Sequence, residues 1–316
     1  MSDAPPLGVQ LEASRAYLWA LAYRLTGCAA DADEITQETL ARALEGPPSG
    51  KLRHWLTRVA VNLGRDELRR RRRGYVGEWL PSPVPADEPP SLEPIELHPG
   101  AEARYSLLES ASVAFLVALE ALTPAQRAVL LLRDVFEMSV SEVSRSLGLS
   151  EGNVKVIHHR ARALMARYDG ERQPIDAGLR ERTRAVMESF LTALATGDAA
   201  AAARLLAPSA RAQSDGGGEF VAALLPINGR ERVLRFLLGI SRKTPVAGYE
   251  VRELNGLPAL VAEVEQRPAR WAPRFVMWTE LDGKGRIAHV HLVLATRKLT
   301  HVAPLVSAGE GRSMGK

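Results

Sequence analysis

The sequence predicts a multidomain protein in which two all-helical domains precede an α+β domain. Up to about residue 170, apolar residues recur at helical spacing, and residues 122–168 form a helix-turn-helix pattern. Beyond residue 170 a few helices are followed by long alternating strands, an order that indicates an α+β layer. The length of 316 residues also exceeds that of one small domain.

Three helices are predicted for the first domain, over residues 11–25, 31–44 and 51–73. Gly27 interrupts the first helix, and the glycine and two prolines at residues 46–48 end the second. The third helix ends in five consecutive arginines, residues 69–73. A basic helix beside aromatic residues suits a phosphate backbone and unstacked bases, because the cations release counterions and the rings stack. A solvated, positively charged helix end is the alternative.

The helix-turn-helix pattern has clear start and stop signals. Thr123 with Pro124 begins one helix, Ser139 caps a shorter one over residues 140–147, and Gly148 supplies a tight turn. Ser150 begins the last helix, whose outer face is polar and basic and therefore fits a duplex-reading unit. An ordinary helical hairpin with a charged face is the alternative. The small core is predicted to hold Val143, Leu147, Leu149, Val154, Ile157, Ala161 and Leu164.

Composition changes mark the remaining boundaries. Seven prolines in residues 81–100 predict an extended linker, so the first domain spans residues 1–80 and the second 101–169. The third domain, residues 170–303, is predicted to have helices at 180–195, from 198 and at 229–238. Its strands are expected at 249–254, 259–266, 274–281 and 287–296, with a hairpin at Asp282-Gly283. Residues 304–316 are expected to be a disordered tail.

Cellular location follows from three further features of the sequence. Cys28 is the only cysteine, so an internal disulfide is excluded and a reducing compartment is favoured. No run of about 20 apolar residues occurs, and the N-terminus lacks the pattern of a secretory signal. We therefore expect a cytoplasmic protein that does not bind a membrane.

Both helical domains resemble parts of a known family. Residues 23–73, with the following YVGEWLP segment at 75–81, resemble region 2 of bacterial sigma factors of the extracytoplasmic-function (ECF) group, and residues 122–168 resemble their region 4. The resemblance implies recruitment of core RNA polymerase to promoter DNA. It places the polymerase contact at Asp33, Glu34, Gln37 and Glu38. It places DNA contacts at Lys51, Arg53, Asn62, Arg65, Asp66 and Arg69, and in region 4 at Asn153, Lys155, Val156, His159, Arg160 and Arg162.

The third domain resembles the SnoaL-like cone fold, which is fused to the C-terminus in one branch of this group. The SDGGG sequence at residues 214–218 and the YVGEWLP segment are similar to two motifs of that branch. Lys298-Leu299 matches the last two residues of a third motif. The resemblance implies control in cis through a contact between two short segments. One holds Trp79 and Leu80, and the other holds Asp215, Gly216, Gly217 and Gly218.

Three residues of the third domain are candidates for a catalytic role. Asp215, His289 and His291 could act as a general base, and histidines two residues apart could bind a metal, but the sequence places no further ligand. We therefore predict no catalytic residue, no cofactor and no metal. The alternatives are a ligand-sensing helix-turn-helix regulator and a cone-fold enzyme with a helical appendage. A small-molecule ligand of the third domain is left open.

Overall fold

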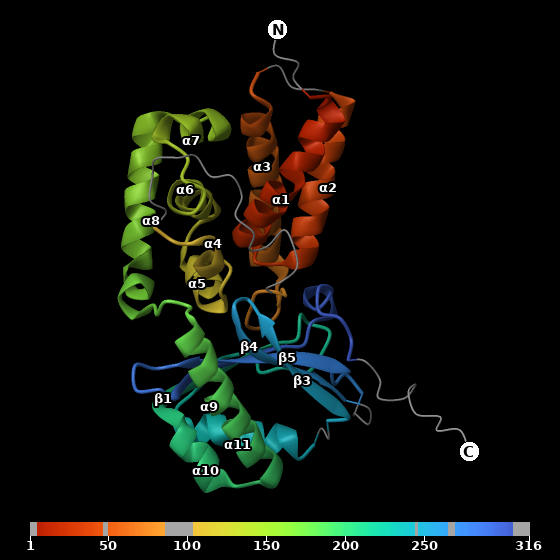
Figure 1. Ribbon diagram of the computed structural model, residues 1–316, viewed down its shortest axis with the longest axis vertical. Coiled ribbons are helices and arrows are strands. Elements are labelled where there is room, and N and C mark those ends of the chain that lie inside the picture. The colour runs from red at the N-terminus through yellow and green to blue at the C-terminus, as the bar shows by residue number, and fades with distance from the viewer. Residues whose placement is uncertain (1–4, 47–49, 86–103, 244–245, 265–268, 306–316) are drawn as a thin grey trace, which may run out of the picture.

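The computed structural model describes residues 5–46, 50–85, 104–243, 246–264 and 269–305. Figure 1 shows a helical half above a sheet, with three further helices against the sheet's far side. The predicted fold class, two all-helical domains and an α+β domain, is confirmed. Among the described residues, no helix is long and apolar enough to cross a membrane.

The first domain consists of α1 (Leu7–Thr26), α2 (Ala29–Glu45) and α3 (Leu52–Gly74). The second consists of α4 (Leu107–Ser110), α5 (Val113–Ala118), η1 (Leu119–Ala121), α6 (Pro124–Asp134), α7 (Val140–Leu147) and α8 (Glu151–Glu171). The predicted capping of this pattern is observed. Thr123 forms a capping box with Gln126, Ser139 forms one with Glu142, and Gly148 adopts a left-handed conformation.

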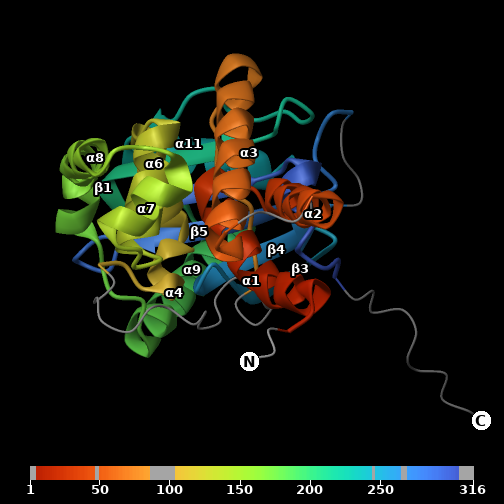
Figure 2. The same ribbon diagram turned by 90° about the horizontal axis from the view of Figure 1, so that it is seen from above.

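The two helical domains share one hydrophobic core. Its buried residues come from α1, α2 and α3 and also from α5, α6, α7 and α8. Tyr17 of α1 and Phe136, just after α6, meet edge to face with ring centroids 5.4 Å apart. Figure 2 shows the two domains side by side over the sheet. Because their apolar surfaces cover each other, the domains form a closed pair.

One predicted core residue of the helix-turn-helix is wrong. Leu164 is 49% exposed, and Met165 is fully buried in its place. The error arises because both leucine and methionine are apolar, and one residue corresponds to about 100° of rotation on a helix. Val143, Val154 and Ala161 are fully buried as predicted, and Leu147, Leu149 and Ile157 pack against them.

The third domain has a sheet between two different layers. Its helices are α9 (Ala177–Thr196), α10 (Ala199–Leu205) and α11 (Arg230–Ser241). The strands are β1 (Leu206–Asp215), β2 (Ile227–Asn228), β3 (Gly248–Leu254), β4 (Leu257–Glu263), β5 (Arg274–Leu281) and β6 (Ile287–Val293), in the order β2-β1-β6-β5-β4-β3. All neighbours are antiparallel except β1 and β6, which are parallel.

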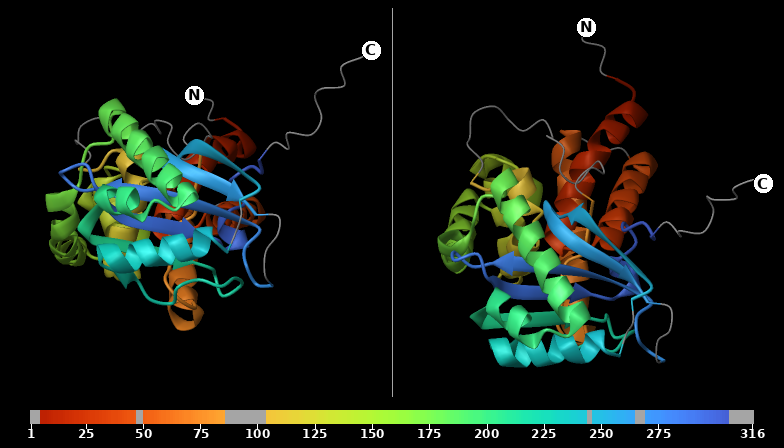
Figure 3. Two further views of the ribbon diagram at one scale, coloured as in Figure 1. Left: turned by 90° about the horizontal axis from the view of Figure 1, so that it is seen from below. Right: turned by 60° about the horizontal axis from the view of Figure 1, so that its bottom comes forward.

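The two faces of the sheet are covered by different parts of the chain. One face packs on α9, α10 and α11 (Figure 3). The other carries Trp278 and Val293, which cluster with Leu80 from the end of the first domain and Val113 from the second. The third domain therefore binds both helical domains through one face of its sheet.

Several boundaries differ from the sequence prediction. Strands β1 and β2 were not expected. The linker, residues 81–100, was predicted to be extended and unpacked, but its Ser82 and Val84 are buried. Beyond Val84, only Pro85 of the predicted linker lies within the described residues. At the other end, Leu305 packs on the third domain, so the expected tail does not begin at 304, and residues 306–316 lie outside the described part.

Candidate functional site

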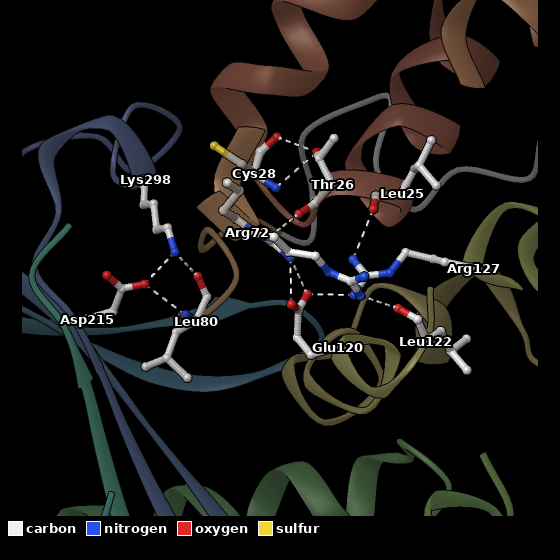
Figure 4. A network of polar contacts seen from close by, with 11 residues as sticks. Leu25, Thr26, Cys28, Arg72, Leu80, Glu120, Leu122, Arg127, Asp215 and Lys298 are labelled. Carbon is white, nitrogen blue, oxygen red and sulfur yellow. Dashed lines mark hydrogen bonds and ion pairs between the residues drawn. The ribbon is translucent and has the colours of Figure 1, made fainter. Parts of the chain in front are cut away.

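A buried carboxylate joins the third domain to the end of the first. Asp215, at the end of β1, is fully buried and accepts hydrogen bonds from the Tyr75 hydroxyl at 2.5 Å and the Leu80 backbone N–H at 2.7 Å. The Gly217 N–H donates to it at 3.0 Å, and the Lys298 ammonium forms an ion pair with it. We call these five residues the Asp215 cluster; Figure 4 shows Asp215, Leu80 and Lys298 converging.

Lys298 completes the charge balance of this cluster. Its ammonium donates to the Leu80 carbonyl as well as to Asp215, and it lies 4.3 Å from the Trp79 ring and 4.9 Å from the Tyr75 ring. Burial lowers the pKa of the Lys298 ammonium, and the Asp215 carboxylate opposes that fall. Burial and the neighbouring Asp215 charge raise the pKa of the Tyr75 hydroxyl. The cluster therefore holds one positive and one negative charge out of water, each with several partners.

The three glycines after Asp215 shape the turn that closes the cluster. Gly217 has a φ of +60°, and a Cβ there would lie 2.7 Å from the Ala295 Cβ, so a larger residue does not fit. The structure thus brings the two predicted segments, 79–80 and 215–218, into contact through the Leu80–Asp215 hydrogen bond. Tyr75 and Lys298 were missed as partners of Asp215, although both lie in or beside segments that the resemblance had singled out.

A second junction, at Asn255, touches all three domains. Asn255 sits in the β3–β4 turn with a φ of 54° and is 1% exposed. Its side-chain amide donates to the Tyr23 hydroxyl and to the Ala111 carbonyl, both at 2.7 Å, and its carbonyl accepts from the Val84 N–H at 3.1 Å. The Asn255-Gly256 dipeptide is a strong hairpin signal in the sequence, but nothing local indicates what its side chain contacts.

A third junction joins the arginine run to the second domain. Glu120 accepts hydrogen bonds from Arg71 and Arg127, both at 2.5 Å. Arg71 also donates to the Thr26 carbonyl at the end of α1. Arg127 donates to the neighbouring Leu25 carbonyl (Figure 4). Burial raises the pKa of the Glu120 carboxyl, but Arg127 and Arg71 outweigh it and hold the pKa below its usual value. Part of the arginine run therefore binds protein rather than being free for nucleic acid.

The predicted polymerase-contact residues on α2 are partly covered by the third domain. His301 contacts Asp33 at 2.8 Å, where the Trp19 indole also donates at 2.7 Å. Arg297 donates to Glu34 and to Asp31, both at 2.9 Å. Gln37 and Glu38, one turn further along, are exposed.

The predicted DNA residues of α3 are mostly accessible. Lys51, Asn62, Asp66 and Arg69 are exposed, and Arg69 pairs with Asp66 at 2.9 Å. Arg53 and Arg65 are half-buried, and the Arg53 guanidinium lies 4.4 Å from the Tyr17 ring. Arg58, which was not among the predicted contacts, donates to the carbonyls of Ser146 and Arg145 at the end of α7.

The recognition helix α8 presents most of its predicted contacts to solvent. Asn153, Lys155, Val156, His159 and Arg160 are exposed. Arg162 is also exposed, but its guanidinium makes two hydrogen bonds to the buried Asp134, at 2.6 and 2.9 Å. His158, which was expected to face outward, is half-buried and also contacts Asp134 at 2.8 Å. Asp134 thus fixes α8 on α6.

The two histidines of β6 gain a third partner from the neighbouring strand. His289 Nδ1 and His291 Nε2 each lie 3.1 Å from a different oxygen of the Glu280 carboxylate. Burial raises the pKa of Glu280, but His291 and His289 outweigh it and hold the pKa well below its usual range. The sequence alone did not indicate Glu280, because it lies nine residues from His289 along the chain. Asp215, the other candidate base, is fully buried and bonded within the Asp215 cluster, so it does not face solvent.

Comparison with known families finds two matches. Residues 11–74 match the model described as Sigma-70 region 2, and residues 112–165 match Sigma-70, region 4. These are the two helical domains described above.

Two individual relatives extend the similarity. The chain is 34% identical over 291 residues to the ECF RNA polymerase sigma factor SigJ of Mycobacterium tuberculosis, covering 87% of this chain and 88% of that protein. The crystal structure of M. tuberculosis SigJ aligns with a TM-score of 0.68 and 27% identity, over 95% of this chain and all of that one. SigG of M. tuberculosis is 40% identical over 168 residues, or 48% of this chain and 45% of that protein.

Proposed function

The chain belongs to the ECF sigma factors of RNA polymerase, and we propose that its third domain controls this function in cis by holding the helical domains closed. Sigma factors act with core RNA polymerase on promoter DNA, so these are the partners that the two matched regions imply. We infer that the chain itself catalyses nothing. The finer assignment of polymerase contacts to α2, and of DNA contacts to α3 and α8, is part of the proposal.

The observation that carries the proposal is the Asp215 cluster. A buried carboxylate of the third domain binds the backbone and side chains of the segment that follows α3, at Tyr75 and Leu80. Partial separation would remove the hydrogen bonds of Asp215 to Tyr75 and Leu80 and that of Lys298 to the Leu80 carbonyl while both charges stay poorly hydrated, so the contact resists partial opening. Coupling of this sort requires two states that the contact distinguishes, and the closed state is one of them.

Two further contacts support control by closure. Asn255 binds both helical domains at once, through Tyr23 and Ala111, so the third domain holds their relative position. Arg297 and His301 lie on the α2 face proposed to bind polymerase. In the open state both restraints would be absent. In the closed state, the third domain would do in cis what a separate anti-sigma protein does in trans.

Transcription in vitro tests this proposal. Full-length wild type and Asp215→Asn are compared with core RNA polymerase on a promoter fragment selected by the holoenzyme. Because asparagine cannot balance Lys298, the closed state is weakened and we expect initiation to rise several-fold at limiting sigma. Asp198→Asn is the matched control, since Asp198 caps α10 away from the helical domains and asparagine caps equally well.

The outcomes separate the alternatives. Unchanged or reduced initiation by Asp215→Asn, with a folded protein, would contradict control by closure. Initiation by neither protein, with tight duplex binding in the absence of polymerase, would instead support the helix-turn-helix regulator. A small-molecule ligand of the third domain stays a prediction. An open hollow lined by residues of β2 and the start of α11 lies outside the three junctions.

A further inference from the structure

Glu280, His289 and His291 form a compact group on the sheet face that also carries Asp215. In the register of the sheet, Glu280 is opposite His289, and Trp278 is opposite His291. On the other side of β6, Arg211 and Gln213 of β1 are opposite His289 and His291, and Asp215 follows at the next position of the same face. Two adjacent strands therefore supply all three side chains from a rigid backbone.

The donor atoms of this group have the spacing of a metal site. The two imidazole nitrogens are each 3.1 Å from an oxygen of Glu280, and all three residues have a donor atom within 4.8 Å of the others. Ligands bound at about 2.1 Å around a tetrahedral ion lie roughly 3.4 Å apart. Small side-chain adjustments, without movement of the strands, would bring all three donors onto one ion.

The charge of the group also favours a cation. In the part of the chain that the structure describes, the Glu280 carboxylate has hydrogen bonds only to the two imidazoles. Arg211 of the neighbouring strand β1 is opposite His289, but its guanidinium pairs with Glu78, at 3.9 Å. A divalent ion bound between the two imidazoles would place a positive charge directly beside the Glu280 carboxylate.

The chemistry of the donors selects the class of ion. Two imidazole nitrogens and one carboxylate oxygen suit Zn²⁺ and related transition metals, whereas Mg²⁺ and Ca²⁺ prefer oxygen ligands alone. His291 is 2% exposed, so its imidazole would bind the ion from the buried side of the site. The His289 side chain is 40% exposed, so an ion could enter from that side and keep water in its remaining positions.

We propose that Glu280, His289 and His291 bind one divalent transition-metal ion, with Zn²⁺ as the best match. The site lies at the boundary between the sheet and the helical domains, and it does not depend on the proposed control by Asp215. The affinity of the site for the ion should be moderate rather than high. In a metal-binding histidine, the ring nitrogen that does not bind the metal normally donates a hydrogen bond, which strengthens metal binding. The corresponding atom of His291, the buried Nδ1, has no such partner among the described residues.

Metal binding by the full-length protein is the test. The protein is stripped with a chelator, and Zn²⁺ is then titrated in competition with a chromophoric chelator. We expect one ion per chain in the wild type, and at least about tenfold weaker binding in both Glu280→Gln and His289→Asn. Co²⁺ provides a second readout, since its visible absorption should report nitrogen and oxygen ligands in the wild type and change in both variants.

Two control variants make the result specific. His301→Asn removes a histidine paired with an aspartate, and His159→Asn removes an exposed histidine on α8. Both should bind Zn²⁺ as the wild type does. Because His289 is partly exposed, its variant should keep the fold, which circular dichroism checks. Wild-type binding no tighter than that of the Glu280→Gln/His289→Asn double variant, or an equal loss in His159→Asn, would overturn the proposal.

Discussion

At the scale of single residues, buried charges hold the domains together. Glu120 binds Arg71 and Arg127, and Asp215 binds Lys298; each pair also satisfies backbone groups of another domain. A buried ion pair contributes little net stability compared with an apolar pair, but loss of one partner leaves a desolvated charge and costs several kcal/mol. Such pairs therefore specify one arrangement of the domains and penalise intermediate ones.

Glu120 makes this argument testable through pH. Because its pKa is lowered in the folded protein, Glu120 contributes stability above the unfolded value near 4.5, and this contribution is lost as the pH falls below it. We expect Glu120→Gln to cost about 2 kcal/mol at pH 7, since glutamine keeps some hydrogen bonds. In urea unfolding the difference from wild type should shrink between pH 5 and about pH 3. The exposed Glu45→Gln is the control, and a difference that stays constant with pH would contradict the assignment.

Only part of this residue-level picture could be predicted from the sequence. Asp215 was found because it lies in a short motif with its glycines, a local pattern. Its partner Lys298 lies 83 residues away, and Asn255 lies 232 residues from Tyr23. Pairs so distant in the chain are set by how the domains pack, which no local pattern encodes. Glu280 is near the histidines in the chain, but it meets them only through the β5–β6 register, which shifts between Glu280 and Leu281 and which the sequence pattern did not fix.

At the scale of elements, local signals decided which predictions succeeded. The helices were found because caps, glycine turns and apolar spacing are all local. Strand β1 was missed because its sequence, LAPSARAQSD, is poor in strand-forming residues. It forms through parallel pairing with β6, and Pro208 falls where the register shifts between Leu206 and Arg211. Tertiary context outweighed propensity there, and the sequence pattern alone could not show it.

Helix ends give a matched pair of variants at this scale. Gly27 ends α1 and Gly197 ends α9, with φ of +73° and +72°. An added Cβ at Gly27 would lie 2.2 Å from the Trp79 ring, whereas at Gly197 nothing lies within 4 Å. Gly197→Ala should cost about 1 kcal/mol from backbone strain alone. Gly27→Ala should cost about 1–3 kcal/mol more, because Trp79 must move.

Thermal or urea unfolding of the two glycine variants measures this difference. Trp79 also stacks on Arg71, which binds Glu120, so its displacement should loosen a junction between the domains as well as the end of α1. Equal losses in the two variants would mean that Trp79 does not pack tightly against the helix end.

At the scale of the whole molecule, one sheet face binds two helical domains that share a core. The Asp215 cluster fixes the first domain, Asn255 fixes both, and Arg297 with His301 reaches α2. These contacts come from separate strands and turns of the third domain. A state in which the helical domains separate must therefore break several of them together, which makes the closed form cooperative. Control by the third domain then depends on whether a partner such as core polymerase binds the same surfaces and displaces these contacts.

The contact on α2 can be weakened without disturbing the buried junctions. The double variant Arg297→Ala/His301→Ala removes the side chains that contact three acidic residues of α2: Asp31, Asp33 and Glu34. If core polymerase binds this face, the variant should bind it more tightly. The Arg297 side chain is 51% exposed, and exposed ion pairs are worth about 0–1 kcal/mol each, so the gain should be about two- to fivefold. It should decrease at high salt, because salt screens the wild-type contact.

Fluorescence anisotropy with labelled full-length protein and core polymerase, at low and high salt, measures this gain. Arg286→Ala is the matched control, since Arg286 pairs with Asp282 within the β5–β6 hairpin and does not reach α2. Equal affinities of the double variant and Arg286→Ala would mean that the third domain does not compete for α2, and weaker binding would mean that Arg297 or His301 itself supports the polymerase contact. In either case the transcription result for Asp215→Asn stands separately, because its contact lies at the end of α3 rather than on α2.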